Sequence, residues 1–417
     1  MPRIPSVNIN KALLVLFALV VLGMNLRSPL TAVPPVLQSI RNDLALNATL
    51  SGLLTSIPVL CFGVLTPLSS LLIARIGINK SMWFTLVGAA IGILFRPYTG
   101  TLGMMAGTFL LGAALAAGNI VSLMIIARDF RQRMSIVTGI YTSSLNIGTM
   151  LTSSLTAPIA LFTGWQFALA SWAWLPILAL ILWLYSQRQC APATNISPEY
   201  NRLPLQSSHP VSGIRKIAIA TLSAGFVAHL FIYYGITAWL PSYLITNGGM
   251  HAATAGGIAS IFQGMALLGA FGVPVLNRYI KSGYLMVAMG VCWGASILFM
   301  SLFPNLWPVW CFIGGIAQGG GFVVIFTLIM QLSPDLDDNR RMSAIVQGIG
   351  YTLASLGPIV VGQFHEMSGQ WSHSWECLIG VSLLMVLSGV IIITITDKTA
   401  SRHDLPVQDG HNSNKVS

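Results

Sequence analysis

Twelve stretches of predominantly apolar residues follow one another along the chain, each close to the length of a bilayer-crossing helix. A helix crosses the hydrocarbon with about 20 residues, and in lipid only structures that satisfy their own backbone hydrogen bonds are stable. Of the 417 residues, 8% are charged, whereas a soluble chain carries roughly a quarter. The pattern excludes a soluble fold. It predicts an all-α membrane protein with about twelve transmembrane helices, at 11–33, 50–73, 82–98, 101–126, 134–161, 166–185, 214–240, 252–276, 283–303, 306–331, 341–364 and 374–396.

The chain divides into two similar halves of six predicted helices each. Arg131-Gln-Arg-Met-Ser135 opens the fifth helix and Asn339-Arg-Arg-Met-Ser343 opens the eleventh, and each helix then reaches a proline, Pro158 or Pro358. The matching positions are charged or turn-forming rather than leucines, which favours a pseudo-symmetric parallel repeat of the kind found in some secondary transporters. We therefore expect an N-terminal half at 1–185, a cytoplasmic linker at 186–213, a C-terminal half at 214–397 and a disordered cytoplasmic tail at 398–417.

The net charge of +10 is concentrated on one side of the predicted membrane domain. Of the 21 lysines and arginines, Arg41 and Arg96 fall in connections on the opposite side and Arg27 falls inside the first helix, which leaves eighteen on the side of both termini. Cytoplasmic loops carry the excess of Lys and Arg. The bias predicts a protein of the bacterial inner membrane, in contact with membrane lipids and with both termini in the cytoplasm. It accounts for the charge without a nucleic-acid partner, and we expect a monomer.

The sequence contains no motif for an enzyme or for a bound cofactor. It has no Gly-x-x-x-x-Gly-Lys-Ser/Thr loop for a nucleotide, and its five scattered cysteines form neither a disulfide framework nor a metal-binding pattern. All eleven acidic residues fall in predicted loops, tails or helix ends. We expect a protein that is not an enzyme and that holds no cofactor and no metal.

Arg27 is the residue that most strongly indicates a functional site, because it lies sixteen residues into the first predicted helix. A charge at such depth costs about 2.5–3.5 kcal/mol or more on insertion scales and by default marks function. The planar guanidinium suits carboxylate, nitro or cyanate-like groups. Pro29, Pro34 and Pro35 follow it, so an alternative interpretation is that Arg27 satisfies the carbonyls of a broken helix. We favour contact with a substrate and keep the structural role open.

The overall plan resembles the major facilitator superfamily, which has six plus six helices, cytoplasmic ends and a central cytoplasmic loop. The superfamily signature, Gly-x-x-x-Asp-Arg-x-Gly-Arg-Arg, corresponds here to the stretch from Ser70 to Lys80. Arg75, Gly77 and Lys80 match it, but Ser70 stands at the position of the glycine and Ala74 at that of the acid. By itself this loop is a degenerate match.

A narrower resemblance covers nearly the whole chain in order. The chain is similar to the group of cyanate permeases and 2-nitroimidazole transporters in the segments Asn25–Pro35, Ser51–Pro58, Gly118-Asn119, Arg128–Phe130, Tyr233–Pro241 and Gln347–Tyr351. This resemblance implies that the first, fourth, seventh and tenth helices line a central cavity. It does not select a substrate, because the two named members carry different molecules.

Polar residues on these helices, and on the eighth and eleventh, complete a candidate substrate-binding site around Arg27. The predicted set is Arg27, Asn25, Thr31, Asn119, His229, Tyr233, Gln318, Gln347 and Tyr351, with Tyr234 and Gln263 as further candidates. For each polar neighbour of Arg27, hydrogen bonding between helices is as good an interpretation as ligand contact. His229 is the mid-helix histidine, and we interpret it as a buried neutral side chain in preference to a proton relay. The run Gly319-Gly-Gly321 is interpreted as a point where the tenth helix bends during transport.

These observations predict a secondary active transporter, similar to the cyanate permeases, for a small solute. The solute is expected to be anionic or to accept hydrogen bonds strongly: cyanate-like, a small carboxylate or a nitro-heterocycle. A multidrug or toxic-compound efflux carrier and a non-transporting solute sensor are the alternatives. The substrate itself, the direction of transport and coupling to protons stay open.

Overall fold

The structure is a computed structural model that describes residues 9–188, 213–333 and 336–403. Within these ranges every regular element is a helix. Twelve of the described helical segments are long and apolar enough to cross a membrane. The all-α class and the number of membrane crossings are therefore confirmed.

The first half contains six of these crossings. Its elements are α1 (Ile9–Thr31), η1 (Pro34–Val36), α2 (Leu37–Leu44), α3 (Ala48–Ile76), α4 (Ile78–Phe95), η2 (Arg96–Tyr98), α5 (Gly100–Asp129), η3 (Arg131–Arg133), α6 (Met134–Thr163), α7 (Trp165–Ser171) and α8 (Trp174–Arg188). The second half contains the other six, made by α9 (Gly213–Thr246), α10 (Ala252–Leu276), α11 (Ser282–Leu302), α12 (Trp307–Leu332), α13 (Leu336–Ala354), α14 (Gly357–Ser368) and α15 (Trp371–His403).

Several crossings are broken near prolines, among them the first and the eleventh. The first runs through α1, η1 and α2 as far as Leu44. Pro34 lies at its break, and because proline has no N–H it cannot donate a helical hydrogen bond. The eleventh crossing is split into α13 and α14, and a proline lies in the first turn of α14, where the missing N–H costs nothing. The first break matters for function because it follows Arg27 by a few residues.

Most of the predicted linker and tail lies outside the described residues. The part of the linker that precedes 189 belongs to the end of α8, and Gly213 begins α9. α15 extends to His403, so the first six residues of the predicted tail, 398–403, are helical. Residues 404–417 lie outside the described ranges, and their disorder stays a prediction.

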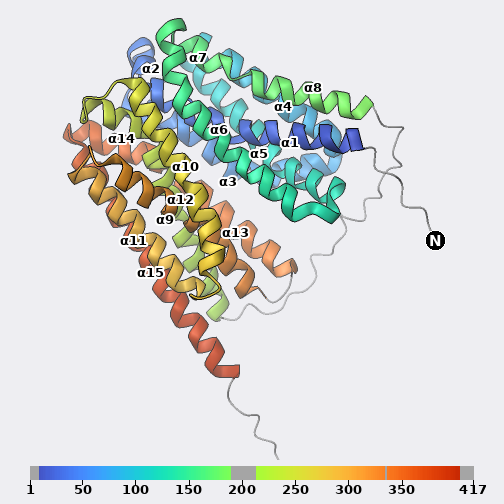
Figure 1. The fold of residues 1–417 in the computed structure, drawn as a ribbon, viewed down its shortest axis with the longest axis vertical. Helices are drawn as coiled ribbons and strands as arrows, with labels where there is room; N and C mark the ends of the chain where they lie inside the picture. The colour runs from blue at the N-terminus through green and yellow to red at the C-terminus, as the bar shows by residue number, and fades with distance from the viewer. Residues whose placement is uncertain (1–8, 189–212, 334–335, 404–417) are drawn as a thin grey trace, which may run out of the picture.

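The two halves are separate helix bundles that meet at one end (Figure 1). The first half, blue to green, and the second half, yellow to red, diverge from the end that holds α2 and α14. Contact between the halves is made mainly by α6 with α10, by α3 with α13 and α14, and by η1 with α9 and α10. At the joined end the Ala48 N–H donates to Glu366 Oε2 at 3.1 Å, and Gln363 Nε2 donates to Thr49 Oγ1 at 2.9 Å.

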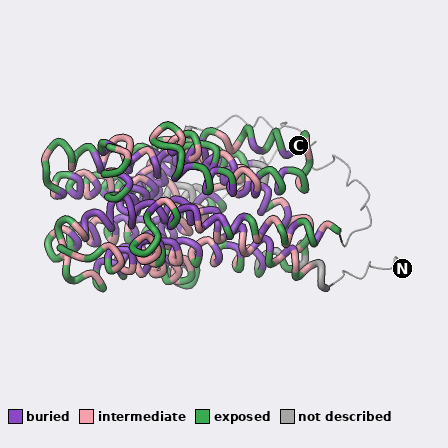
Figure 2. The backbone as a smooth tube through the Cα atoms, turned by 90° about the horizontal axis from the view of Figure 1, so that it is seen from above, coloured by how far each residue is buried: buried purple, intermediate pink, exposed green. Residues whose placement is uncertain are grey.

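The outer surface of the bundle is apolar. Figure 2 shows buried segments in the interior and exposed ones along the outside. Large apolar side chains are fully open there, among them Phe162 (89% exposed), Leu102 (86%) and Leu71 (63%). A soluble protein rarely exposes apolar patches of this extent, so this surface is the face that contacts lipid.

The glycine run of α12 serves close helix packing. α12 passes through residues 319–321 as one continuous helix. A Cβ atom on Gly319 would overlap the carbonyl oxygen of Ala266 and lie 2.9 Å from the Ala270 nitrogen, both on α10. Small residues let membrane helices approach closely, because lipid supplies no hydrophobic drive between them. The structure thus gives Gly319 a packing role, and bending of this helix during transport stays a prediction.

Candidate functional site

Arg27 lies near the C-terminal end of α1, before the last helical turn and the break in the chain at 32–33. The broken turn frees carbonyl groups, and one of them is taken by another arginine: Arg96 Nη2 donates to the Pro29 carbonyl at 3.2 Å. Arg96 was expected in an open connection, but it lies in η2 with only 1% of its surface exposed. Arg96 therefore has the helix-repairing role that the sequence left open for Arg27.

The Arg27 guanidinium faces the second half of the protein. Its Cζ atom lies 5.9 Å from the centre of the Phe322 ring on α12. Tyr233, Tyr234, Tyr351 and Tyr141 are its electrostatic neighbours. No carboxylate is among these neighbours. The half-buried cation is thus surrounded by aromatic rings and hydroxyls, an environment in which an anion can bind it.

Four polar side chains form a hydrogen-bonded network across α9, α10 and α12, and one of them, Tyr233, is a neighbour of Arg27. The Tyr233 hydroxyl donates to Gln263 Oε1 at 3.4 Å, and Gln318 Nε2 donates to the same oxygen at 2.7 Å. Gln263 Nε2 donates to Thr237 Oγ1 at 3.2 Å. Gln318 Oε1 is buried and has no partner among the described residues. This oxygen can accept a hydrogen bond from a bound molecule.

Four other predicted residues differ in their contacts: Thr31 and Asn119 have hydrogen-bond partners within the protein, whereas none is found for Asn25 among the described residues. Thr31 and Thr152 are joined through their hydroxyls at 2.7 Å, which links α1 to α6. The Tyr141 hydroxyl donates to Asn119 Oδ1 at 3.5 Å. Asn25 is fully buried, and among the described residues neither its side-chain oxygen nor its nitrogen has a partner. Gln347 on α13 is half-buried. Contact of these four residues with a ligand stays a prediction.

His229 is bonded to a tryptophan of a neighbouring helix. Trp293 Nε1 on α11 donates to His229 Nδ1 at 3.1 Å, and the histidine is 1% exposed. An indole nitrogen only donates, so Nδ1 must be the acceptor and the proton of the neutral ring must lie on Nε2. The geometry supports the interpretation of His229 as a neutral structural side chain.

Replacing His229 with phenylalanine is expected to lower stability by about 1–3 kcal/mol, because it leaves the buried Trp293 N–H without an acceptor. His229→Gln, which keeps an acceptor, should lose less, and Trp293→Phe combined with His229→Phe should recover part of the loss. The thermal unfolding midpoint in detergent measures each effect. An unchanged midpoint for His229→Phe would show that the contact contributes nothing.

Sequence reasoning missed several neighbours of Arg27 that a stricter use of helical spacing would have found. Phe322 lies four residues after the predicted Gln318 and therefore on the same helix face. Tyr141 follows the repeated motif of the fifth helix, and Tyr351 follows the matching motif of the eleventh. Only Tyr351 was selected. Arg96 carries no such signal, because its burial depends on how η2 packs against α5 and α7.

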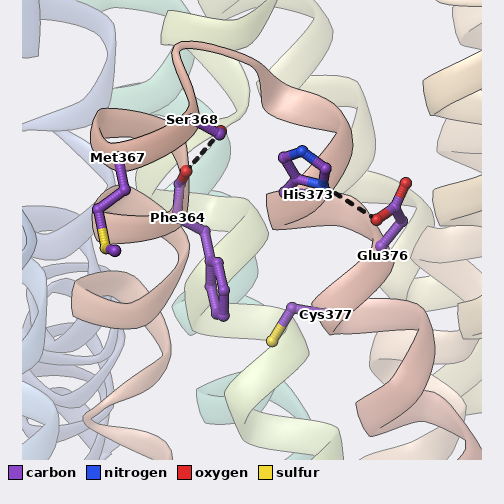
Figure 3. A pocket seen from close by; sticks show the side chains of 6 residues that line it. All are labelled: Phe364, Met367, Ser368, His373, Glu376 and Cys377. Carbon is purple, nitrogen blue, oxygen red and sulfur yellow. Dashed lines mark hydrogen bonds and ion pairs between the residues drawn. The ribbon is translucent and has the colours of Figure 1, made fainter.

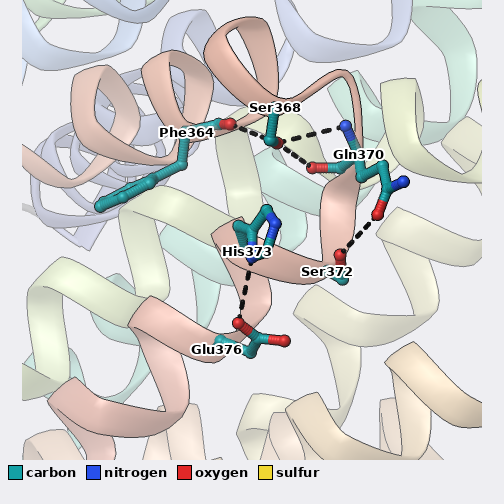
Figure 4. Close-up of polar contacts among 6 residues, drawn as sticks. All are labelled: Phe364, Ser368, Gln370, Ser372, His373 and Glu376. Atoms are coloured by element: carbon teal, nitrogen blue, oxygen red, sulfur yellow. Dashed lines mark hydrogen bonds and ion pairs between the residues drawn. The ribbon is translucent and has the colours of Figure 1, made fainter.

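A shallow surface hollow of about 440 Å3 lies elsewhere, at the corner between α14 and α15 (Figure 3). Its lining includes His373, Glu376 and Cys377 but none of the predicted site residues. Figure 4 shows its polar contacts: His373 Nδ1 lies 3.2 Å from Glu376 Oε2, and Ser368 bonds to backbone atoms of the turn. His373 and Glu376 are more than half exposed, where ion pairs contribute little. These contacts belong to the corner itself.

Comparisons with known proteins agree with this architecture. The sequence pattern of the Major Facilitator Superfamily matches residues 13–362. The uncharacterized transporter YycB of Bacillus subtilis is 31% identical over 89% of this chain and 91% of its own length. The 2-nitroimidazole transporter of Escherichia coli is 28% identical over 92% of this chain and 96% of its own. The cyanate transport protein CynX of Escherichia coli is 28% identical over 88% and 95%.

Among solved structures, a bacterial homologue of the human lysosomal transporter Spinster matches with a TM-score of 0.69. Its sequence is 14% identical, and the match covers 94% of this chain and 98% of that one. At this identity it supports the fold alone. The relatives named above are transporters, so the expectation of a carrier and not an enzyme is confirmed. Sequence, structure and relatives together show that the chain belongs to the Major Facilitator Superfamily, as a multi-pass transporter of the bacterial inner membrane.

Proposed function

We propose that the chain is a secondary active transporter for a small solute that is anionic or accepts hydrogen bonds strongly. The observation that carries this proposal is Arg27, a half-buried cation that faces the other half of the protein and has no carboxylate of the described residues among its electrostatic neighbours. A charged side chain at membrane depth is energetically costly, and by default it indicates a functional site. A fork of N–H donors pairs well with the oxygens of a carboxylate or nitro group.

The named relatives support the same chemistry. One is described as a transporter of 2-nitroimidazole and another as a transport protein for cyanate. Both solutes present electronegative atoms that accept hydrogen bonds, although one is an aromatic ring and the other a small linear anion. The property they share, electronegative atoms that accept hydrogen bonds, is the one that a guanidinium recognises.

Transport follows an alternating-access cycle in this proposal. The hydrogen bonds that join Ala48 to Glu366 and Thr49 to Gln363 hold the halves together at one end. Both termini lie in the cytoplasm, as the bias of Lys and Arg indicates, and the joined end then faces the periplasm. The site around Arg27 is reached from the cytoplasmic side in this state.

Uptake into proteoliposomes tests the function. We expect the purified protein to accumulate one or more labelled solutes from a panel of nitrate, cyanate, benzoate and 2-nitroimidazole, with saturation. Solutes that bind should also raise the unfolding midpoint, since a ligand present at 100 times its Kd stabilises the folded state by about 2.7 kcal/mol. Binding and uptake of organic cations, with no response to any member of this panel, would contradict the proposal.

A further inference from the structure

Aromatic rings form a connected cluster beside Arg27. Phe322 contacts Phe326 and Phe226 with ring centres 4.7 and 5.8 Å apart. Phe226 lies 5.7 Å from Tyr351. Tyr351 in turn lies 5.7 Å from Phe62 of the first half. We call this set, Phe62, Phe226, Phe322, Phe326 and Tyr351, the aromatic cluster.

The cluster lies where the two halves meet. Phe62 is on α3 and Tyr351 on α13, so their contact crosses between the halves. The contact of Arg27 on α1 with Phe322 on α12 crosses in the same way. A molecule bound to Arg27 at this joint therefore has aromatic rings within reach from both halves.

The members differ in burial in a way that suits a binding surface. Phe226 and Tyr351 are buried, at 0% and 8% exposure. Phe62, Phe322 and Phe326 keep part of their surface accessible, as Arg27 does. The buried rings support the cluster. Phe322 presents ring surface next to the guanidinium, with Phe326 packed on Phe322 and Phe62 packed on Tyr351.

The aromatic cluster favours some of the solutes that an arginine could bind over others. A linear or trigonal inorganic anion has almost no apolar surface, so aromatic rings add little to its binding. A planar ring that carries a carboxylate or nitro group can give its oxygens to Arg27 and stack or pack edge-to-face on the phenylalanines. The unpartnered Gln318 Oε1, in a residue that is 5% exposed, further suits a ligand with an N–H or O–H group.

We infer, on the basis of the proposed function, that the preferred substrates are single-ring aromatic anions and nitro-heteroaromatic compounds, and that Phe322 and Phe62 select them over aliphatic and inorganic anions. Arg27 binds the oxygens of the solute and the aromatic cluster binds its ring. Phe322 makes a cation–π contact with Arg27, and in this inference it also contributes to substrate specificity.

Two carboxylates of similar size separate these roles. Benzoate and cyclohexanecarboxylate carry the same anionic group, and the saturated ring is the less able to make aromatic contacts. We expect the purified full-length protein to bind benzoate about tenfold more tightly than cyclohexanecarboxylate, and nitrate more weakly than either, as measured by calorimetry and by the shift in unfolding midpoint. Equal affinity for the two carboxylates would overturn the inference.

The variant Phe322→Leu keeps an apolar side chain and removes the ring. The preference for benzoate should fall to within about twofold, while cyclohexanecarboxylate should bind nearly as before. Phe162→Leu, on the 89% exposed lipid-facing surface, is the matched control and should keep the preference. If Phe322→Leu does not fold, Phe62→Leu on the other half makes the same test. A preference that persists without the ring would show that the cluster does not select substrates.

The same binding measurements distinguish failure of the aromatic preference from failure of the proposed function. If nitrate, benzoate and cyclohexanecarboxylate all bind through Arg27 with equal affinity, the anion carrier stands and the aromatic preference fails. If none of them binds, the proposed function itself fails.

Discussion

Replacing Arg27 with alanine is expected to reduce the affinity for an anionic substrate by about 10- to 100-fold and to abolish net uptake. Hydrogen bonds to charged groups contribute about 1.5–3 kcal/mol, and each 1.4 kcal/mol is tenfold in affinity. The variant should still fold, because the carbonyl freed by the broken helix is bonded by Arg96 and not by Arg27. Calorimetric Kd values and initial uptake rates in proteoliposomes measure the effect.

Arg27→Lys separates charge from geometry. Lysine keeps the positive charge but cannot present the planar fork, so its affinity should fall between those of the native protein and of Arg27→Ala. Arg278→Ala controls for the loss of one positive charge, because Arg278 is exposed in the turn after α10. If Arg27→Ala inserts normally and transports with unchanged affinity, Arg27 is structural and the proposed site is wrong.

Replacing Gly319 with alanine is expected to destabilise the protein by about 1–3 kcal/mol, the usual cost of overpacking. The added methyl group would overlap the Ala266 carbonyl oxygen, so α10 and α12 would have to separate. Elsewhere in a helix the same change is stabilising, by roughly 0.5–1 kcal/mol, because alanine loses less backbone entropy. The unfolding midpoint of the purified protein shows the sign directly.

Gly272 offers the matched control on the facing helix α10, because no described atom lies within 4 Å of the Cβ that a substitution would add. Gly272→Ala should leave the midpoint unchanged or raise it. A destabilised Gly319→Ala beside a neutral Gly272→Ala is the result expected of close packing. If Gly319→Ala kept the native midpoint but slowed transport, the glycine run would instead act as the bend that its sequence first indicated.

The sequence predicted part of the candidate site because helix spacing is local. Arg27 was selected from its depth in an apolar helix, and Tyr233 and Tyr351 as polar residues on other predicted helices. The structure makes both tyrosines electrostatic neighbours of Arg27. Gln318 was selected in the same way, and it joins them through Gln263. For Thr31 and His229 the sequence offered two interpretations of equal chemistry, and their bonds to Thr152 and Trp293 could not be read from spacing within one helix.

The transporter family was indicated by motifs that resemble those of its members. The sequence by itself also determined the helical class and the twelve crossings, because a bilayer accepts only segments that are long, apolar and internally hydrogen-bonded. Those properties are local to each stretch of chain. The tertiary structure alone decided that Arg96 bonds the freed carbonyl of the broken helix, that Gly319 packs against α10, and that phenylalanine and tyrosine side chains lie around the half-buried Arg27. Each of these is a contact between helices distant in sequence, and such contacts depend on how the helices are packed and rotated in three dimensions.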